Sequence, residues 1–336
     1  MRAPSGFQPG RTVHLHPTTN CNLACRHCYS SSSPASRRAV ALEHLASCMR
    51  CLRDEGYDVA SLSGGEALLY PAIRPLVAGL KALGYRINLV SNGSTISSRF
   101  DDVLDALDVI AVSFDGDRDL HNEIRGSEHA FAHAVRGLEH LRARGRKAAI
   151  AYCVTRRSLP DIPQVSELAI AHGVALLQLR PLVLTGRARA HMAQDALGES
   201  DVNRLFLITL ALRQELGDKL AIHLDLVHGT AVAAHRDQYD VLFNATDPGA
   251  APLSDLVNPL VITADGNVRP LTYGFDGRFD LGVAAEISAA SLANYKGAGI
   301  AALRRHMIAA FDRAAGENRL IDWFAYCADE GASARP

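Results

Sequence analysis

Three cysteines lie within eight residues near the start of this 336-residue chain, at Cys21, Cys25 and Cys28. They are too close together to form a disulfide framework, and the total of seven cysteines is odd, so the pattern indicates a metal site. Thiolates spaced in this way can each bind one iron of a four-iron cubane, which leaves the fourth iron open to a small molecule. A structural zinc site is the alternative, and it needs a fourth ligand, either His27 or a distant residue.

An aromatic residue, Tyr29, follows the cysteines, and this pattern resembles the signature of the radical S-adenosylmethionine (SAM) superfamily. The later run Gly64-Gly65-Glu66 resembles the family's Gly-Gly-Glu motif, in which glycines allow close backbone approach and the carboxylate accepts hydrogen bonds from the SAM ammonium group. The resemblance covers about residues 12–190. It implies one 4Fe–4S cluster and SAM as cofactors, and a 5′-deoxyadenosyl radical that takes a hydrogen atom from the substrate.

The resemblance also implies which residues hold SAM. Arg125 is the expected partner of the SAM carboxylate, because a guanidinium binds a carboxylate through two parallel hydrogen bonds. Tyr29 is expected to pack near the adenine. The alternatives are ordinary turn chemistry for the polar strand ends and a core position for Tyr29. The predicted SAM contacts are Tyr29, Gly64, Gly65, Glu66, Ser91, Asn92, Ser113, Arg125 and Leu179.

Residues 258–295 resemble the C-terminal extension called SPASM, which occurs in enzymes that modify ribosomal peptides. In that family a cysteine that ligates an auxiliary cluster normally follows the Asp-Gly turn, but this chain has Leu271 there and only Cys327 beyond it. One thiolate does not hold a cluster, so we expect a SPASM-like extension without an auxiliary cluster. The run Gly-Arg-Ala at 186–188 is similar to one in peptide-modifying relatives.

Two further cysteines are candidate hydrogen-atom donors to a substrate radical. Cys327 is the first, by similarity to related epimerases in which a lone cysteine has this role, and its alternative is packing in a helix. Cys153 is the second, because it ends a predicted strand and is expected to face the mouth of a barrel. Cys48 and Cys51 lie one helical turn apart and are expected to be packing residues rather than a redox pair. The candidate substrate-side acid–base groups are Tyr152, Asp225, Asp240 and Tyr273.

Short apolar runs alternate six times with amphipathic stretches, which predicts parallel strands joined by right-handed crossovers. Each motif follows a predicted strand, at the end where such folds place their chemistry. We therefore expect an α/β fold, a partial (β/α)6 TIM-like barrel with a smaller α+β C-terminal extension.

The predicted domains are an N-terminal tail (1–11), the barrel (12–190) and the extension (191–336). The predicted strands are 12–16, 59–63, 85–91, 109–114, 147–154, 175–180 and 220–226, with a hairpin at 260–271. The predicted helices are 38–55, 71–83, 96–107, 128–144, 161–172, 201–216, 288–312 and 320–328.

The composition excludes several classes of protein. A net charge of -1 argues against nucleic acid as the main partner. The sequence holds no run of 18 apolar residues and no signal peptide, so we expect a cytoplasmic protein without a membrane span.

The resemblance favours a peptide substrate, most simply a ribosomally synthesised precursor that is crosslinked or epimerised. Only about eleven residues precede the first strand, so we expect recognition by the C-terminal half or by a separate leader-peptide-binding protein. An electron donor such as flavodoxin or ferredoxin is also implied. The alternative is a small-molecule substrate, either an aminoglycoside-type sugar or a tetrapyrrole. A remote alternative is a non-catalytic zinc or iron–sulfur module.

Overall fold

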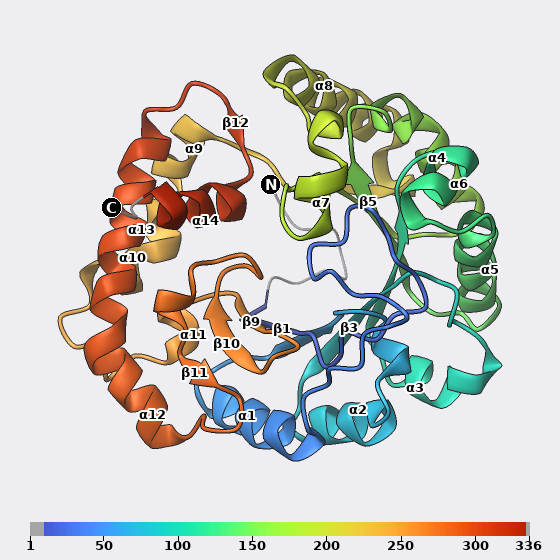
Figure 1. Ribbon diagram of the computed structural model, residues 1–336. Helices are drawn as coiled ribbons and strands as arrows, with labels where there is room; N and C mark the ends of the chain where they lie inside the picture. The colour runs from blue at the N-terminus through green and yellow to red at the C-terminus, as the bar shows by residue number, and fades with distance from the viewer. Residues whose placement is uncertain (1–9, 334–336) are drawn as a thin grey trace.

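Ten strands form one sheet in the computed structural model, which describes residues 10–333 (Figure 1). Its order is β11-β10-β9-β1-β2-β3-β4-β5-β6-β7, and the neighbours from β9 to β7 are parallel. The first six strands along the chain are β1 (Thr12–Leu15), β2 (Val59–Leu62), β3 (Arg86–Ser91), β4 (Val109–Phe114), β5 (Ala148–Val154) and β6 (Leu176–Pro181). The predicted six-strand parallel α/β architecture is confirmed. The predicted tail lies outside the described residues except for 10 and 11.

Strands from the second half of the chain extend the sheet at both edges. They are β7 (Ala221–Leu224), β9 (Leu260–Ile262), β10 (Asn267–Pro270) and β11 (Gly282–Val283). β7 pairs with β6, β9 pairs with β1, and β9 with β10 forms the predicted hairpin. The sheet therefore continues past the domain boundary predicted at residue 190. Because β7 and β11 are its two edges, the sheet is curved but open.

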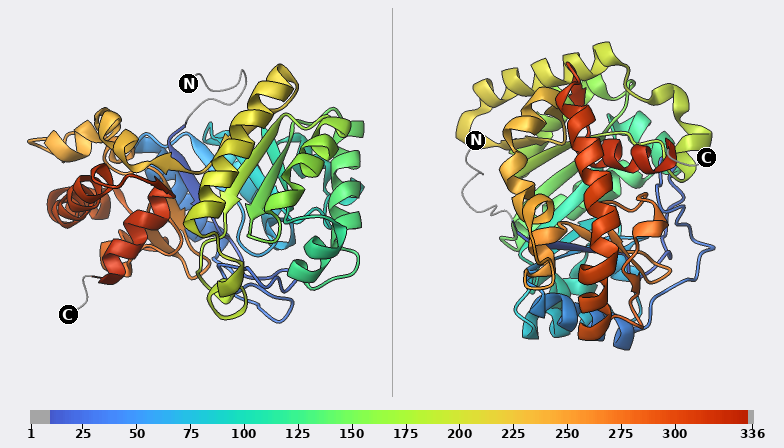
Figure 2. Two further views of the ribbon diagram at one scale, coloured as in Figure 1. Left: turned by 90° about the horizontal axis from the view of Figure 1, so that it is seen from above. Right: turned by 90° about the vertical axis from the view of Figure 1, so that its left-hand side faces the viewer.

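Helices cover the convex face of the sheet (Figures 1 and 2). They include α1 (Leu42–Asp54), α2 (Ile73–Ala82), α3 (Asp101–Asp105), α5 (Ala130–Ala143), α6 (Ile162–Ala171) and α8 (Glu199–Leu216). In α1 the buried residues Leu45, Cys48, Met49 and Leu52 recur at helical spacing, so Cys48 packs in the core as predicted. No helix among residues 10–333 is both long and apolar enough to span a membrane.

Several predicted helices differ from those observed. The first begins at Leu42 rather than residue 38, because residues 38–40 bond to the segment after β1 through Thr19 N–H to Arg38 O and Val40 N–H to Pro17 O. The helix predicted at 96–107 is only a short 3-10 turn followed by α3.

The C-terminal half shows further differences. The helix predicted at 288–312 is divided by a π-helical turn into α12 (Ala289–Asn294) and α13 (Ile300–Ala315). The helix predicted at 320–328 was wrong for its first two residues, because β12 (Leu320–Ile321) pairs with β8 (Val227–His228) before α14 (Trp323–Ser333) begins. Five helices were not predicted: α4 (Arg118–Arg125), α7 (Arg187–His191), α9 (Gly229–Ala234), α10 (Asp240–Asn244) and α11 (Leu253–Leu256).

The concave side of the sheet encloses a cavity of about 2870 Å³. Strand side chains alternate, so Leu15 and Leu62 are buried against the helices while His14, Ser61 and Asn88 line the cavity. These inward side chains are small or polar and leave the interior of the sheet unfilled. The cavity reaches the carboxyl ends of the strands, where His27 and Tyr29 of the cysteine loop line it.

Candidate functional site

The three predicted cluster cysteines lie on the loop that follows β1. Cys21 and Cys25 are buried and Cys28 is half-buried, and with Leu23 they form a small apolar cluster separate from the main core. Backbone hydrogen bonds hold the loop to α4, where Arg26 N–H donates to the carbonyl of Ile124 at 2.8 Å. The protein itself therefore fixes the shape of this loop.

The spacing of the thiols distinguishes between the two metal sites that the sequence left open. A tetrahedral zinc ion with Zn–S bonds of about 2.3 Å brings its sulfur ligands within about 3.8 Å of one another. Among the described residues, the ligand atoms that lie within 4.8 Å of one another in a group of three belong to His27, Asp115 and Cys153. The three loop cysteines do not form such a group. Wider spacing fits a cubane, in which each thiol binds a different iron.

The electrostatic surroundings of the thiols also fit a cationic cluster. Burial raises the pKa of Cys21 to about 12 and that of Cys25 to about 11, so deprotonation requires added positive charge. Cys21 Sγ accepts from the N–H of Leu23 at 3.4 Å and from Asn92 Nδ2 at 3.9 Å, contacts that favour a thiolate. The donor set and its surroundings therefore fit an iron–sulfur cluster.

Gly64 and Gly65 pack directly against the start of the cysteine loop. A Cβ on Gly65 would lie 2.2 Å from the carbonyl oxygen of Asn20, and one on Gly64 would lie 2.8 Å from that of Thr18. The N–H groups of Gly65 and Glu66 donate to these same two carbonyls at 2.8 and 2.9 Å. The close backbone approach that requires glycine is therefore made to the loop.

Glu66 joins the carboxyl ends of β2 and β3. Its carboxylate accepts from Ser91 Oγ at 3.1 Å, from the N–H of Asn92 at 3.0 Å and from the N–H of Leu68 at 3.4 Å. Burial raises the pKa of Glu66, and the hydrogen bonds oppose that shift. Asn92 Nδ2 also donates to Asn22 Oδ1 at 2.9 Å in the cysteine loop. Three predicted SAM contacts are thus assembled into one network beside the cysteines.

The Gly-Arg-Ala run holds the cysteine loop from its other side. Gly186 has a φ of +55°, and a Cβ there would lie 2.3 Å from the carbonyl oxygen of Tyr29. Arg187 donates from its backbone N to Cys28 O at 3.0 Å, from Nε to Cys25 O at 2.8 Å and from Nη2 to Ser32 O at 2.7 Å. From the sequence, this run was known only as similar to one in peptide-modifying relatives. Its role in holding the cysteine loop was not predicted.

Arg125, the predicted partner of the SAM carboxylate, is paired within the protein. Its Nε lies 2.6 Å from Asp115 Oδ2, and His27 Nε2 lies 3.0 Å from Asp115 Oδ1. Burial opposes ionisation of the Asp115 carboxyl group. The Arg125 guanidinium and the His27 imidazole outweigh burial and hold the pKa of the carboxyl well below its usual range. A SAM carboxylate at Arg125 would therefore share the guanidinium with Asp115.

Tyr29 meets the C-terminal half of the chain at the cavity rim. Its hydroxyl lies 3.3 Å from Ser63 Oγ and 3.5 Å from His16 Nδ1. Its ring centroid lies 5.2 Å from that of Tyr273, which follows β10, and both rings contact His16. Residues after 190 therefore help to shape the site beside the predicted adenine position.

The remaining candidates divide between the cavity wall and the core. Ser113 and Cys153 line the cavity, and burial raises the pKa of the Cys153 thiol to about 12, so it keeps its hydrogen at neutral pH. Leu179 is fully buried on the helix side of β6, whereas its neighbours Gln178 and Arg180 face the cavity.

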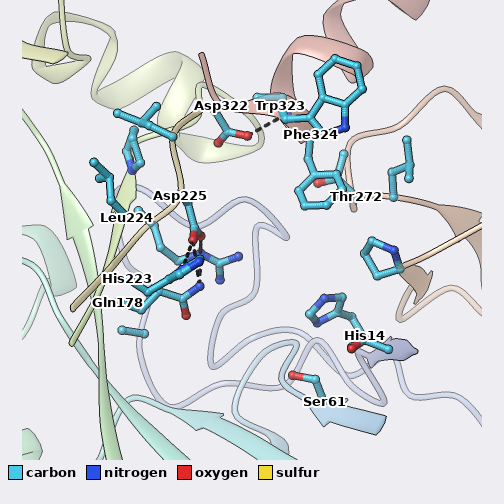
Figure 3. A pocket seen from close by; sticks show the side chains of 18 of the residues that line it. His14, Ser61, Gln178, His223, Leu224, Asp225, Thr272, Asp322, Trp323 and Phe324 are labelled. Atoms are coloured by element: carbon cyan, nitrogen blue, oxygen red, sulfur yellow. Dashed lines mark hydrogen bonds and ion pairs between the residues drawn. The ribbon is translucent and has the colours of Figure 1, made fainter. Parts of the chain in front are cut away.

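Cys327 requires a correction, because the structure does not place it at the site. Its side chain is fully buried in the main core, and burial raises its pKa. The cavity is lined instead by Asp322, which precedes α14, and by Trp323 and Phe324 in the first turn of that helix (Figure 3). Cys327 is therefore a packing residue in this structure, which was the alternative interpretation of the sequence.

A second polar group lies on the opposite wall of the cavity and was largely missed from the sequence. Asp225 was a candidate, and Figure 3 shows it beside Gln178 and His223, which were not. The available signal was the alternation of polar residues at 178, 180, 223 and 225. Of the other acid–base candidates, Tyr273 is described above, Asp240 is exposed, and the Tyr152 hydroxyl donates to Ser158 O at 2.8 Å.

Comparison with known proteins agrees with this geometry. Residues 15–168 match the radical SAM superfamily. The pre-heme d1 synthase of Dinoroseobacter shibae is 30% identical over 193 residues, which cover 56% of this chain and 47% of that protein. The sporulation killing factor maturation protein SkfB of Bacillus subtilis is 24% identical over 213 residues, which cover 62% of this chain and 51% of that protein. The chain spans about half the length of the curated relatives it matches.

The fold is also shared with a solved structure. SuiB of Streptococcus suis, solved with S-adenosylmethionine bound, has a TM-score of 0.69 at 16% identity, covering 88% of this chain and 68% of that chain. The same protein has also been solved with its precursor peptide SuiA. At this identity the likeness shows the fold alone. Radical SAM enzymes use a 4Fe–4S cluster and SAM as cofactors. The match, the open parallel sheet and the three cysteines at its rim together identify residues 15–168 as a radical SAM domain.

Proposed function

We propose that this protein cleaves SAM reductively and takes a hydrogen atom from a ribosomally synthesised precursor peptide, which it crosslinks or epimerises. The observation that carries the proposal is the position of the cysteine loop at a cavity of about 2870 Å³, which His27 and Tyr29 of that loop line. A substrate in this cavity would lie next to the loop that carries the cysteines.

The residues of this chain have separate tasks in the proposed reaction. Cys21, Cys25 and Cys28 would hold the cluster, which together with SAM supplies the electron and the 5′-deoxyadenosyl radical. The backbone of Gly65 and the side chain of Arg187 fix the loop from two sides. A fixed loop keeps the reactive end of the cavity in one geometry, which positional catalysis requires.

Two features support a peptide as the substrate. Large apolar side chains that are exposed to solvent line the cavity, where they can bind apolar side chains of a substrate: Tyr29, Val183, Phe206, Val241 and Phe324. SkfB is named as a maturation protein for a sporulation killing factor, and SuiB has been solved bound to the precursor peptide SuiA. The partners that we propose are this peptide, an electron donor such as flavodoxin or ferredoxin, and a separate leader-peptide-binding protein.

We propose a single cluster in this protein. Leu271 stands where an auxiliary-cluster cysteine is expected, and its side chain is buried in the core. The four remaining cysteines do not gather at one site: Cys48 and Cys327 lie in the core, Cys51 packs against it, and Cys153 lies on the cavity wall. This arrangement favours epimerisation, or another reaction that needs no auxiliary cluster to remove an electron.

A tetrapyrrole is the second candidate substrate. The observation that favours it is the similarity to proteins named as synthases of heme-type molecules, including Fe-coproporphyrin III synthase and pre-heme d1 synthase. Those proteins are matched over about half of their length, so their substrates are only a hypothesis for this chain.

The two candidates can be separated by coupled SAM cleavage. Anaerobic holoenzyme is reduced with dithionite and given either short peptides encoded beside its gene or Fe-coproporphyrin III, and 5′-deoxyadenosine is measured. A peptide that raises 5′-deoxyadenosine above the substrate-free rate and changes in mass or stereochemistry supports the proposal. Turnover of Fe-coproporphyrin III without any effect of peptides would overturn it. The Cys25→Ala variant is the control for cluster-dependent cleavage.

A further inference from the structure

One carboxylate organises the cavity wall formed by β6 and β7 (Figure 3). Asp225 accepts from Gln178 Nε2 at 3.1 Å to each oxygen, accepts from Arg180 Nε at 2.7 Å, and lies 2.9 Å from His223 Nδ1. All four side chains line the cavity, because they alternate along two neighbouring parallel strands. These bonds fill the hydrogen-bonding capacity of the Asp225 carboxylate.

Asp225 is therefore a positioning residue. Burial opposes its ionisation, but Arg180 and His223 outweigh burial and lower its pKa to about 2. The ionised carboxylate accepts a hydrogen bond from Nδ1–H of His223, and in that tautomer of the imidazole Nε2 is an acceptor. The His223 side chain is 62% exposed, so that acceptor is available to a ligand in the cavity.

Arg180 presents donors next to this acceptor. Its Nε is bound to Asp225, and no hydrogen bond within residues 10–333 engages its two terminal amino groups. Its side chain is 53% exposed and lies within electrostatic range of Tyr29, the aromatic residue beside the cluster cysteines. Because one carboxylate holds both Arg180 and His223, the donor pair and the acceptor stay side by side.

The local charge decides which ligand fits this pair. Arg180 and Asp225 neutralise one another, so this wall has no net positive charge left over. Asp322, the residue before α14, faces the same space, and burial raises the pKa of its carboxyl group. His14, on β1 across the cavity (Figure 3), stays neutral, because burial and Arg180 lower its pKa to about 4. A free carboxylate would find no net positive charge at this wall and would face the carboxyl group of Asp322. A neutral carboxamide offers an acceptor and a donor without added charge.

We propose that Arg180 and His223 bind a carboxamide unit of the substrate, whose C=O accepts from the Arg180 fork and whose N–H donates to His223 Nε2. This inference rests on the proposed function, because a peptide supplies such units in its backbone and in Asn and Gln side chains. The site anchors the substrate close to the cysteine loop.

The test uses Trp323, the single tryptophan of the chain, which lines the same cavity. Reconstituted holoenzyme with SAM is titrated with a capped trialanine peptide, acetylated and amidated, and tryptophan fluorescence is followed. We expect saturable binding that is weakened about fivefold to tenfold in Arg180→Gln and in His223→Ala, each of which loses one hydrogen bond. Asp225→Asn should weaken binding similarly and remove the fixed Nδ1–H tautomer of His223 in nitrogen-15 NMR spectra. Asp54→Asn, an exposed site on α1 outside the cavity, is the matched control that leaves binding unchanged.

Two results would overturn the inference. One is equal affinity of the peptide for wild type, Arg180→Gln and His223→Ala. The other is that coproporphyrin III binds more tightly than the peptide and that Arg180→Gln abolishes this binding. That result would make this a carboxylate site. Release of 5′-deoxyadenosine is measured on the same samples. If 5′-deoxyadenosine is released and either of these results is found, only the carboxamide site is refuted. If wild type releases no 5′-deoxyadenosine under any substrate condition, the proposed function is refuted.

Discussion

Replacement of Asp115 by Asn tests the reasoning about the buried ion pair beside the cysteine loop. The side chains of Asp115 and Arg125 are 1% and 6% exposed. The substitution removes the negative charge but leaves the buried guanidinium of Arg125 without its counter-ion. Loss of one partner of a buried pair costs about 3–5 kcal/mol of unfolding free energy. Because both groups are almost fully buried, solvent screening reduces this figure little.

The measurement is urea unfolding of wild type and Asp115→Asn at several pH values. The folded-state pKa of Asp115 is held below its usual range, so its stabilisation is fully present above the unfolded-state pKa of about 3.9. It is lost only as pH falls further, through the lower folded-state pKa. The stability difference between the two proteins should therefore be constant from about pH 5 to pH 8 and shrink below about pH 4.

The matched control is Asp102→Asn. Asp102 pairs with Arg74 at 2.7 Å, but the two side chains are 57% and 48% exposed, so the substitution should move the urea midpoint little. The reasoning would be refuted if Asp115→Asn lowered the free energy of unfolding by less than about 1 kcal/mol, which is the loss expected for a surface pair.

Three further predictions concern the loop and the cavity. Gly65→Ala should abolish iron binding after reconstitution, because the new Cβ would lie 2.2 Å from a backbone oxygen of the loop. The control is Gly79→Ala in α2, where a Cβ would have no atom within 4 Å. This control should stabilise the protein by up to about 1 kcal/mol in thermal unfolding. Arg187→Ala removes two hydrogen bonds to loop carbonyls, worth about 1.5–3 kcal/mol each, and iron retained after gel filtration should fall; full retention would count against the loop-fixing role. Cys153→Ala should preserve SAM cleavage but suppress product formation if the Cys153 thiol donates hydrogen to the substrate radical. Cys327→Ala should lower only the melting temperature of the protein. Loss of product in Cys327→Ala alone would instead make Cys327 the hydrogen donor.

Much of the fold was predictable because its signals are local. β3 alternates half-buried and buried residues along Arg86–Ser91, and α1 repeats apolar residues at helical spacing. α4 was missed because it is short and mostly polar, although Asp117 caps its start and Gly126, with a φ of +66°, ends it. The pairing of β9 with β1 joins segments far apart in the chain, and no local pattern specifies it.

The candidate site divides in the same way. Cys21, Cys25 and Cys28 were predictable because they are neighbours in one loop, and Ser91 and Asn92 because they end a strand. The hydrogen bond from Arg187 to Cys25 O joins residues 162 positions apart, and those between Gln178 and Asp225 join residues 47 positions apart. Such contacts depend on how strands and loops meet in space, so they required the structure.

The central claim is that Cys21, Cys25 and Cys28 hold one cluster that cleaves SAM. The most direct test is anaerobic reconstitution with iron and sulfide, followed by counting iron per chain and 5′-deoxyadenosine released from SAM with dithionite. The account predicts about four irons per chain and released 5′-deoxyadenosine, both lost in Cys25→Ala. One zinc per chain with no cluster, or about eight irons per chain, would contradict it.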